Sequence, residues 1–288
     1  MTHLLTVAGL GAESFDEILA LSELPDLGLP LAGKGVALVF QKPSARTRNS
    51  MEMAVVQLGG HPVYIQKEEV GLGARESAAD VARTLACYHA IVAARVVDHG
   101  DLEAMAAAME KPLLNLLSDR AHPLQALADL LTVKQLLGRL EGARIAYVGD
   151  ANNVCRSLSE ACALLGVELR IASPESYGLG ETPEHVTQLV DPAEAVEGAD
   201  IVYTDVWVSM GQDEETEARA KAFVAYRVDE ALMARCPGAR FLHCLPARRG
   251  EEVSAGVIDG PQSAVWLQAE NRMHSARGAL AWLMGVRV

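Results

Sequence analysis

The 288-residue sequence predicts an α/β fold made of two doubly wound domains, each built on a parallel sheet. Two observations predict it. Short runs rich in aliphatic and β-branched residues alternate with longer segments of helical periodicity, and this alternation occurs in two successive series. Strands separated by helices favour right-handed crossovers and therefore parallel pairing. Half of the residues are hydrophobic, which supplies a substantial core and argues against disorder.

The first series of elements begins near residue 36. Its expected strands are residues 36–40, 62–65, 90–95 and 112–116, and its expected helices are residues 47–58, 77–87, 102–109 and 123–137. In the last of these helices Leu124, Leu127, Leu130 and Leu131 share one face, a pattern typical of core packing.

The second series follows Gly138. Its expected strands are residues 145–148, 167–172, 201–204 and 240–242, with a helix at residues 156–165. We therefore expect a first domain at residues 1–130 and a second at residues 131–268. A final helix from about residue 269 to residue 284, within the C-terminal segment 269–288, is expected to pack back on the first domain.

Charge and cysteine content narrow the function classes. The formal net charge of −13 argues against a nucleic-acid surface or an anionic membrane as partner, although a local arginine cluster can still bind a small anion. Five cysteines without CxxC spacing do not suggest a disulfide framework, and no secretory signal or membrane-spanning stretch is visible. We expect a protein of the reducing cytoplasm.

The run Ser44-Ala45-Arg46-Thr47-Arg48 is the strongest local signal for a ligand. It places two guanidinium groups and two hydroxyls directly after an expected strand, where a helix begins. The free N–H groups and the positive dipole end of a helix N-terminus attract anions, and forked guanidinium groups suit phosphate. The alternative interpretation is a solvated helix start with incidental arginines.

Other polar residues also follow expected strands, where ligands bind in open α/β sheets. Arg95 ends one strand, and His122 and Gln125 lie three residues apart at a helix start, so both can face one ligand. Taken singly, Arg95 also fits an ion pair at the sheet rim, and His122 a capping residue.

The second series carries three further polar segments after its strands. The first is Gly149 to Asn153, which lacks the GxGxxG spacing of a dinucleotide turn. The second is Thr204 to Gly211, which contains Asp205, Ser209 and Met210. The third is His243-Cys244-Leu245-Pro246. The segment Glu270 to His274 opens the final helix. Ordinary turns, a buried inert thiol and a charged helix start are the alternatives, and no HExxH or paired CxxC indicates zinc.

The order of these motifs resembles the carbamoyltransferase family. SxRTR, a strand-end Arg, HPxQ, GDxNN, DxWxSMG, HCLP and ENRMH follow one another from about Leu5 to Arg277, and DxWxSMG resembles the ornithine-specific members. The resemblance implies a transferase with a carbamoyl-phosphate domain, an amino-acid domain and a closing cleft between them. It also implies arginine and amino-acid biosynthesis, a homotrimer or a multiple of trimers, and no metal or organic cofactor.

The resemblance implies roles residue by residue. For carbamoyl phosphate the expected residues are Ser44, Ala45, Arg46, Thr47, Arg95, His122, Gln125, Cys244, Leu245 and Arg272. For ornithine they are Asn153, Asp205, Ser209 and Met210, and the catalytic group is expected to comprise Arg95, His122, Asp205 and Cys244. The implied reaction is attack of the δ-amine of L-ornithine on the carbamoyl carbon, giving L-citrulline and phosphate.

Two positions depart from the family pattern. Ala45 stands where relatives commonly have Thr, although its backbone N–H remains, and Gly71 stands where relatives often have a Gln that reaches a neighbouring subunit's site. The alternatives that stay open are another amine acceptor, such as putrescine, an N-acylated ornithine or aspartate, and a non-catalytic binding or structural protein.

Overall fold

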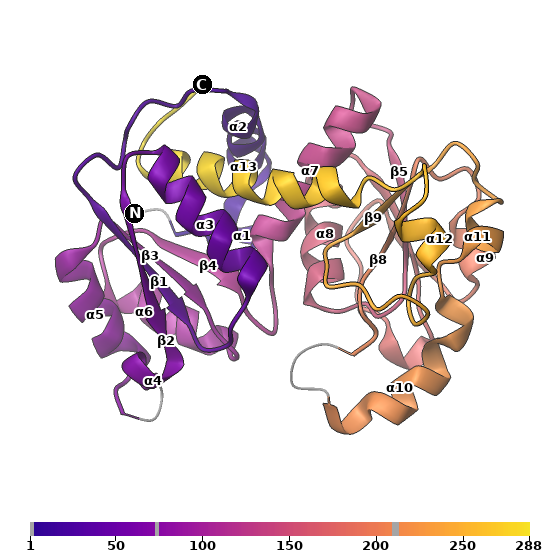
Figure 1. Ribbon diagram of the computed structural model, residues 1–288, viewed down its shortest axis with the longest axis horizontal. Coiled ribbons are helices and arrows are strands. Elements are labelled where there is room, and N and C mark those ends of the chain that lie inside the picture. The colour runs from indigo at the N-terminus through magenta and orange to yellow at the C-terminus, as the bar shows by residue number, and fades with distance from the viewer. Residues whose placement is uncertain (1–2, 73–74, 209–212) are drawn as a thin grey trace. The chain divides into compact units, whose positions relative to one another are not determined.

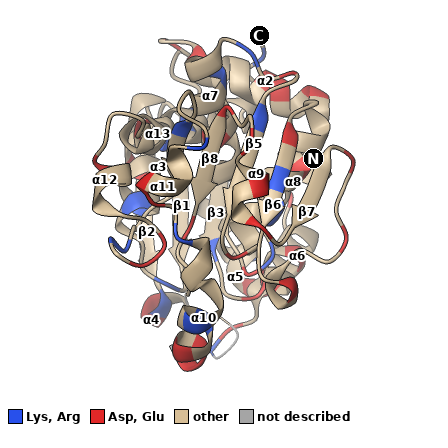
Figure 2. Ribbon diagram, turned by 90° about the vertical axis from the view of Figure 1, so that its right-hand side faces the viewer, with Lys and Arg blue, Asp and Glu red and all other residues tan. Residues whose placement is uncertain are grey.

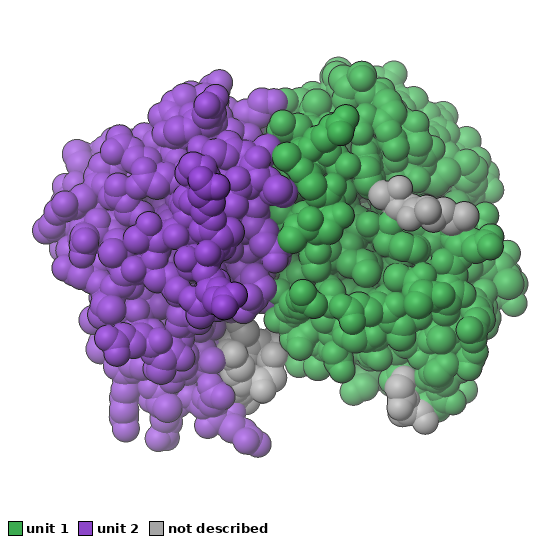
Figure 3. Space-filling model, turned by 180° about the vertical axis from the view of Figure 1, so that it is seen from behind, with its two compact units in different colours: residues 1–131, 271–288 green, residues 132–270 purple. Residues whose placement is uncertain are grey.

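The computed structural model describes residues 3–72, 75–208 and 213–288 (Figure 1). The chain divides into two compact units, which Figure 3 colours separately: unit 1 comprises residues 1–131 and 271–288, and unit 2 comprises residues 132–270. Each unit contains its own parallel sheet, so the predicted α/β fold class with two parallel-sheet domains is confirmed.

The sheet of unit 1 has the strand order β2-β1-β3-β4, and all of its pairings are parallel. Its strands are β1 (Gly35–Phe40), β2 (His61–Gln66), β3 (Ile91–Arg95) and β4 (Leu113–Leu117). All four expected strands are present, and each end agrees with the prediction to within one residue. Residues 36–40 of the central strand β1 are all buried, as expected for a strand that is covered on both faces.

Two helices, α1 (Val7–Leu10) and α2 (Ala12–Glu23), precede the first strand of unit 1, and helices follow each strand. The helices after the strands are α3 (Ala45–Gln57), α4 (Lys67–Val70), α5 (Ala78–Tyr88), α6 (His99–Ala108) and α7 (Pro123–Leu137). Ser44, Ser77 and Asp98 cap α3, α5 and α6 by accepting backbone N–H bonds, which explains where these helices begin. Residues of α5 and α6 share one hydrophobic cluster with Val39 and Val92 of the sheet.

The sheet of unit 2 has the order β7-β6-β5-β8-β9, again entirely parallel. Its strands are β5 (Arg144–Val148), β6 (Glu168–Ala172), β7 (Val186–Leu189), β8 (Ile201–Thr204) and β9 (Arg240–His243). The sequence did not predict β7. This edge strand has only four residues, and its Thr187 and Gln188 are exposed, so it lacks the apolar run that marks the other strands.

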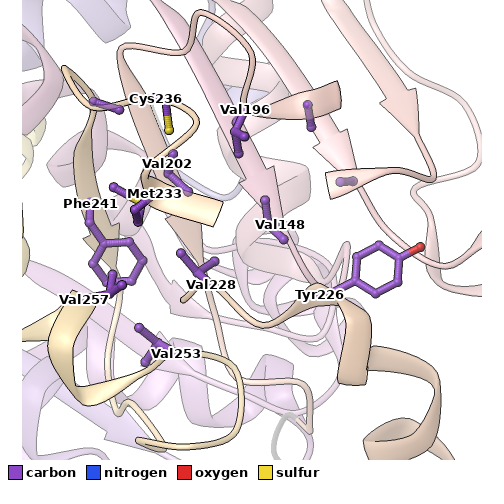
Figure 4. Packing of buried hydrophobic residues seen from close by; sticks show 14 of the residues in the cluster. Val148, Val196, Val202, Tyr226, Val228, Met233, Cys236, Phe241, Val253 and Val257 are labelled. Atoms are coloured by element: carbon purple, nitrogen blue, oxygen red, sulfur yellow. The ribbon is translucent and has the colours of Figure 1, made fainter. Parts of the chain in front are cut away.

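The helices of unit 2 are α8 (Asn153–Leu164), α9 (Pro192–Ala195), α10 (Thr216–Phe223), α11 (Glu230–Met233) and α12 (Ala255–Ile258), with 3₁₀ turns at η1 (Glu175–Tyr177), η2 (Asp213–Glu215) and η3 (Val224–Tyr226). Residues of α9 to α12 belong to a hydrophobic cluster, part of which Figure 4 shows. Val148, Val202 and Phe241 of the sheet meet Met233 and Val257 from α11 and α12 in this cluster.

The last helix, α13 (Val265–Leu283), begins four residues before the expected start at Ala269. The sequence prediction took the charged segment at Glu270 as the helix start. The helix starts earlier, and its first residue, Val265, packs in the core of unit 2. Both unit boundaries fall inside helices, one in α7 and one in α13.

Charged residues lie mainly on the helices and loops, as the coloured segments in Figure 2 show. In the described part of the chain, no helix combines the length and apolar character needed to cross a membrane. In contrast to the charged residues on the helices and outer loops, a few charged and polar residues lie at or just after the carboxyl ends of buried strands. Arg95 ends β3, His122 follows β4, Asp205 follows β8 and Cys244 follows β9.

Candidate functional site: two polar half-sites

The N-terminus of α3 forms the first part of a polar half-site in unit 1. Ser44 is its N-cap, and the Ser44 hydroxyl accepts the backbone N–H of Thr47 at 3.3 Å and donates to the Thr47 hydroxyl oxygen at 3.2 Å. Thr47 is buried, whereas Ala45 and Arg46 are exposed. The unbonded N–H groups of a first helical turn and the nearby Arg46 together suit an anion.

The two arginines of this run have different surroundings. Arg48 forms an ion pair with Glu52 at 2.8 Å, and its guanidinium carbon lies 3.9 Å from the centre of the Tyr64 ring. Arg46 instead contributes positive charge to the environment of Arg95. The structure therefore separates the run into Arg46, which belongs to the half-site, and Arg48, which is already neutralised by a neighbour.

Arg95, Arg272 and His122 form the buried part of the unit 1 half-site. Burial lowers the pKa of Arg95 to about 10, and the charges of Arg272 and Arg46 add to this effect, so Arg95 stays protonated at neutral pH. Burial, followed by the charges of Arg272 and Arg95, holds the pKa of His122 well below 6.5. His122 is therefore neutral and can donate one N–H to a ligand, and the gathered positive charge favours an anion.

Gln125 links Arg272 to a buried carboxylate. The Gln125 amide nitrogen donates to Asp129 Oδ1 at 2.7 Å, and the Gln125 oxygen accepts a hydrogen bond from Arg272. Gln125, Asp129 and Arg272 are 1%, 0% and 6% exposed, so solvent does not compete for these bonds. Because Asp129 binds the amide nitrogen, the amide oxygen is turned towards the cation, which orients Arg272.

Asp205 is the centre of a second polar half-site, in unit 2. This carboxylate is buried, and it accepts the Val206 backbone N–H and the Asn152 side-chain amide, each at 2.8 Å. Within residues 3–72, 75–208 and 213–288, no cationic side chain lies within ion-pair distance of Asp205. A buried carboxylate in such surroundings is well suited to an ammonium ligand.

Asn152, rather than its neighbour Asn153, makes this contact with Asp205. Asn152 caps α8 by accepting the backbone N–H groups of Val154 and Cys155, so its oxygen is used by the helix and its nitrogen faces Asp205. Asn153 is the first residue of α8 and is half-buried. Both adjacent amides were candidates for a polar ligand in the sequence, and the family resemblance assigned Asn153, not Asn152, to ornithine.

Arg219 connects the turn after β5 to the segment after β8. Its guanidinium lies 3.0 Å from Asp150 Oδ2, donates to the Trp207 carbonyl at 3.0 Å, and donates to Glu215 at 2.8 Å. Arg219 is only 6% exposed, so these bonds are shielded from water. It thereby fixes the backbone two residues after Asp205.

Cys244 lies beside Asp205 in the same half-site, and Leu245 follows it in the chain. One nitrogen or oxygen of Asp205 and His243 and the sulfur of Cys244 all lie within 4.8 Å of one another. His243 Nδ1 accepts the Leu245 backbone N–H at 2.9 Å, and His243 Nε2 contacts Glu252 at 3.1 Å. Both ring nitrogens are thus bonded within the protein, which does not fit a metal ligand.

Two of the expected ligand residues, Ser209 and Met210, lie outside the described residues.

Gly71, the position that departs from the family pattern, ends α4 with a φ of +57°. A Cβ added there would lie 2.7 Å from that of Arg75, so a side chain at this position would be strained.

Two family models match the chain. One describes the aspartate/ornithine carbamoyltransferase carbamoyl-P binding domain and matches residues 2–135. The other describes the aspartate/ornithine carbamoyltransferase Asp/Orn binding domain and matches residues 141–283. The first covers the segment that contains Arg46, Arg95 and His122, and the second covers the segment that contains Asp205 and Cys244.

Individual relatives agree with these matches. The ornithine carbamoyltransferase of Thermus thermophilus is 45% identical over 98% of this chain and 96% of its own length. The anabolic ornithine carbamoyltransferase of Pyrococcus furiosus is 45% identical over 88% of this chain and 85% of its own. A solved structure of the ornithine carbamoyltransferase from Pyrococcus furiosus superimposes with a TM-score of 0.92 at 41% identity, covering 98% of this chain and 97% of that one.

Proposed function

Because the chain belongs to the aspartate/ornithine carbamoyltransferase family, we propose that it transfers the carbamoyl group of carbamoyl phosphate to the δ-amine of L-ornithine. The products are L-citrulline and phosphate. The observation that carries this proposal is the buried cation cluster of Arg95 and Arg272 around a neutral His122, with Arg46 beside it. We assign carbamoyl phosphate to unit 1 and ornithine to unit 2.

The unit 1 half-site matches the charge of carbamoyl phosphate. In the proposed complex Ser44, Arg46, Thr47 and the backbone N–H of Ala45 hold the phosphate, and Arg272 adds a further cation. Arg95 and the neutral His122 donate to the carbamoyl oxygen. Negative charge grows on that oxygen during attack, so donors already fixed there stabilise the transition state more than the ground state.

Gln125 has a second role in this proposal. The sequence prediction placed it on the carbamoyl group, where its remaining N–H can still donate. Its bonds to Asp129 and Arg272 also make it the residue that orients Arg272. Both roles place Gln125 on the donor side of the reaction.

The unit 2 half-site matches an amino-acid acceptor. We assign Asp205 to an ammonium group of ornithine, with Asn152 and Asn153 beside it, and Cys244 and Leu245 to the reacting groups. Ser209 and Met210 remain assigned to ornithine by family resemblance. The neutral δ-amine forms the C–N bond and loses a proton, while the bond from the carbamoyl carbon to the phosphate oxygen breaks. Holding the amine at attack distance supplies much of the rate enhancement.

The proposal also includes a metabolic role, an oligomeric state and a cellular compartment. The Pyrococcus furiosus relative is named as an anabolic enzyme, and we extend citrulline formation for arginine biosynthesis to this chain. We further propose a homotrimer in the cytoplasm, and sedimentation equilibrium of the purified chain tests the trimer.

An acceptor assay tests the function. Purified protein and carbamoyl phosphate are incubated separately with L-ornithine, putrescine, N-acetylornithine and L-aspartate, and each product is quantified. Citrulline from ornithine at a kcat/KM at least tenfold above the other acceptors is expected. Turnover of another amine without turnover of ornithine would contradict the acceptor assignment.

Arg46 and Arg48 give a matched pair for the donor assignment. Arg46→Ala should raise the KM for carbamoyl phosphate by about 100-fold, because a charged bond to phosphate is lost. Arg48→Ala should change it by less than about threefold, since Arg48 is exposed and already paired with Glu52. Equal effects of the two substitutions would show that the phosphate is bound elsewhere.

A further inference from the structure

We propose that Glu252 is a positioning residue for the carbamoyl transfer, acting through His243 on Cys244 and Leu245. The inference rests on the proposed function, and it concerns a residue that contacts neither assigned substrate. Glu252 and His243 are 0% and 1% exposed. A carboxylate buried this completely is costly, and an apolar residue of similar size would serve packing at least as well.

The contacts of Glu252 fix one form of the His243 ring. The Leu245 backbone N–H donates to His243 Nδ1 at 2.9 Å, so Nδ1 is the acceptor nitrogen and the proton is on Nε2. Nε2 then donates to Glu252 Oε1 at 3.1 Å, and the same oxygen accepts the Arg248 backbone N–H. Glu252 therefore stabilises the tautomer in which Nδ1 can hold Leu245.

The backbone held by this chain of bonds is unusual. Leu245 has a φ of +62°, a region that residues with a branched side chain seldom adopt. Such a conformation persists only where surrounding bonds enforce it, and here the enforcing bond runs from Leu245 to His243. The His243 backbone is itself held, because its N–H donates to the buried Gln268 side chain at 2.8 Å.

These bonds also define what His243 does not do. Both of its ring nitrogens are used, so it has no free nitrogen with which to accept a proton from the substrate amine. Its function is to hold the Leu245 backbone and thereby to keep Cys244 next to Asp205, and Glu252 keeps it in the form that does so. Loss of Glu252 should free the ring to exchange tautomers and loosen the Leu245 turn.

Three variants test this inference: Glu252→Leu, Glu252→Gln and the control Val253→Ala. Glu252→Leu should lower kcat at saturating substrates by about 30-fold and leave the KM for carbamoyl phosphate within threefold. Glu252→Gln retains an acceptor oxygen and should recover kcat to within about fivefold of the parent. Val253 is adjacent and fully buried in the core, so Val253→Ala should reduce thermal stability without lowering kcat per folded molecule.

The ring form is read independently by ¹⁵N–¹H correlation of histidine-labelled protein, with His243 assigned from the spectrum of His243→Gln. The parent should show protonation on Nε2 alone, and Glu252→Leu should show a mixture of tautomers. An unchanged His243 spectrum in Glu252→Leu, or a kcat loss matched by Val253→Ala at equal destabilisation, would overturn the proposal. Failure of the parent to carbamoylate any amine would overturn the proposed function, while the tautomer experiment would still test the hold of Glu252 on His243.

Discussion

The two half-sites have opposite charge and different supports. In unit 1, Arg46 at the start of α3, Arg95 at the end of β3 and Arg272 within α13 gather positive charge in a chain that is acidic overall. In unit 2, Asp205 is a buried carboxylate held by a cap residue and a backbone N–H. The difference supports the proposed division of the substrates, because a cationic site suits a phosphate and an anionic site suits an amine.

The buried residues that orient these charged groups also have opposite charges in the two units. In unit 1 a buried carboxylate, Asp129, orients a cation through Gln125. In unit 2 a buried cation, Arg219, fixes the backbone beside a carboxylate, through Trp207. In both cases the supporting group has the charge opposite to that of the ligand-binding group. Substitutions can therefore separate donor effects from acceptor effects.

The largest expected effect comes from Arg95. Arg95→Ala should lower kcat/KM by about 1,000-fold or more, because it removes a fixed donor from the oxygen on which charge develops. Steady-state kinetics with both substrates varied measures the loss. A decrease below tenfold would show that the oxygen is stabilised by other residues.

Asp205→Asn should give the next largest effect, and on the other substrate. The variant keeps the size of the side chain and removes its charge, so the KM for ornithine should rise by about 100-fold. The KM for carbamoyl phosphate should stay within about threefold. An equal rise in both Michaelis constants would contradict the separation into a donor and an acceptor half-site.

Asn152→Ala is expected to have a smaller effect. The substitution removes the amide that holds Asp205 and also removes the cap of α8. We expect the free energy of unfolding to fall by about 1–2 kcal/mol and kcat/KM for ornithine to fall by about tenfold. Asn153→Ala serves as the matched comparison in the same kinetic and urea-unfolding assays. A larger effect at Asn153 would restore the sequence-based choice of that residue.

The smallest expected effect concerns pH and His122. Its pKa in the folded protein lies well below the unfolded value of 6.5, so only the unfolded chain gains a proton as pH falls below 6.5. This group therefore costs stability at low pH, by about 1 kcal/mol at pH 5.5. Urea unfolding of the parent and His122→Gln at pH 7.5 and 5.5 measures it: the pH-dependent loss should be smaller in the variant. An equal loss in both proteins would show that His122 is protonated in the folded state.

Local sequence patterns predicted most of the fold. Apolar runs such as residues 36–40 are buried on both faces, so their composition alone marks them as strands. The edge strand Val186–Leu189 and the apolar start of α13 were not predicted, because the first is half-exposed and the second is determined by packing in unit 2. Such features depend on neighbours that are distant in sequence.

The site was predicted less completely. Residues at or just after strand ends, such as Arg95 and Asp205, could be proposed from the sequence because the carboxyl ends of parallel strands are a recurring position for ligands. Asp129, Arg219 and Glu252 act only through a neighbour, and for Arg219 and Glu252 an isolated charged residue within a helix or loop gives no sequence signal for that role. A charged residue four positions after a motif residue, as Asp129 is after Gln125, was the available hint.

Calorimetric titration of carbamoyl phosphate into Arg95→Ala and Asp205→Asn tests the division between the half-sites most directly. Binding should be weakened at least 100-fold in Arg95→Ala and remain within threefold of the parent in Asp205→Asn. Retained binding in Arg95→Ala together with lost binding in Asp205→Asn would contradict the assignment of carbamoyl phosphate to unit 1.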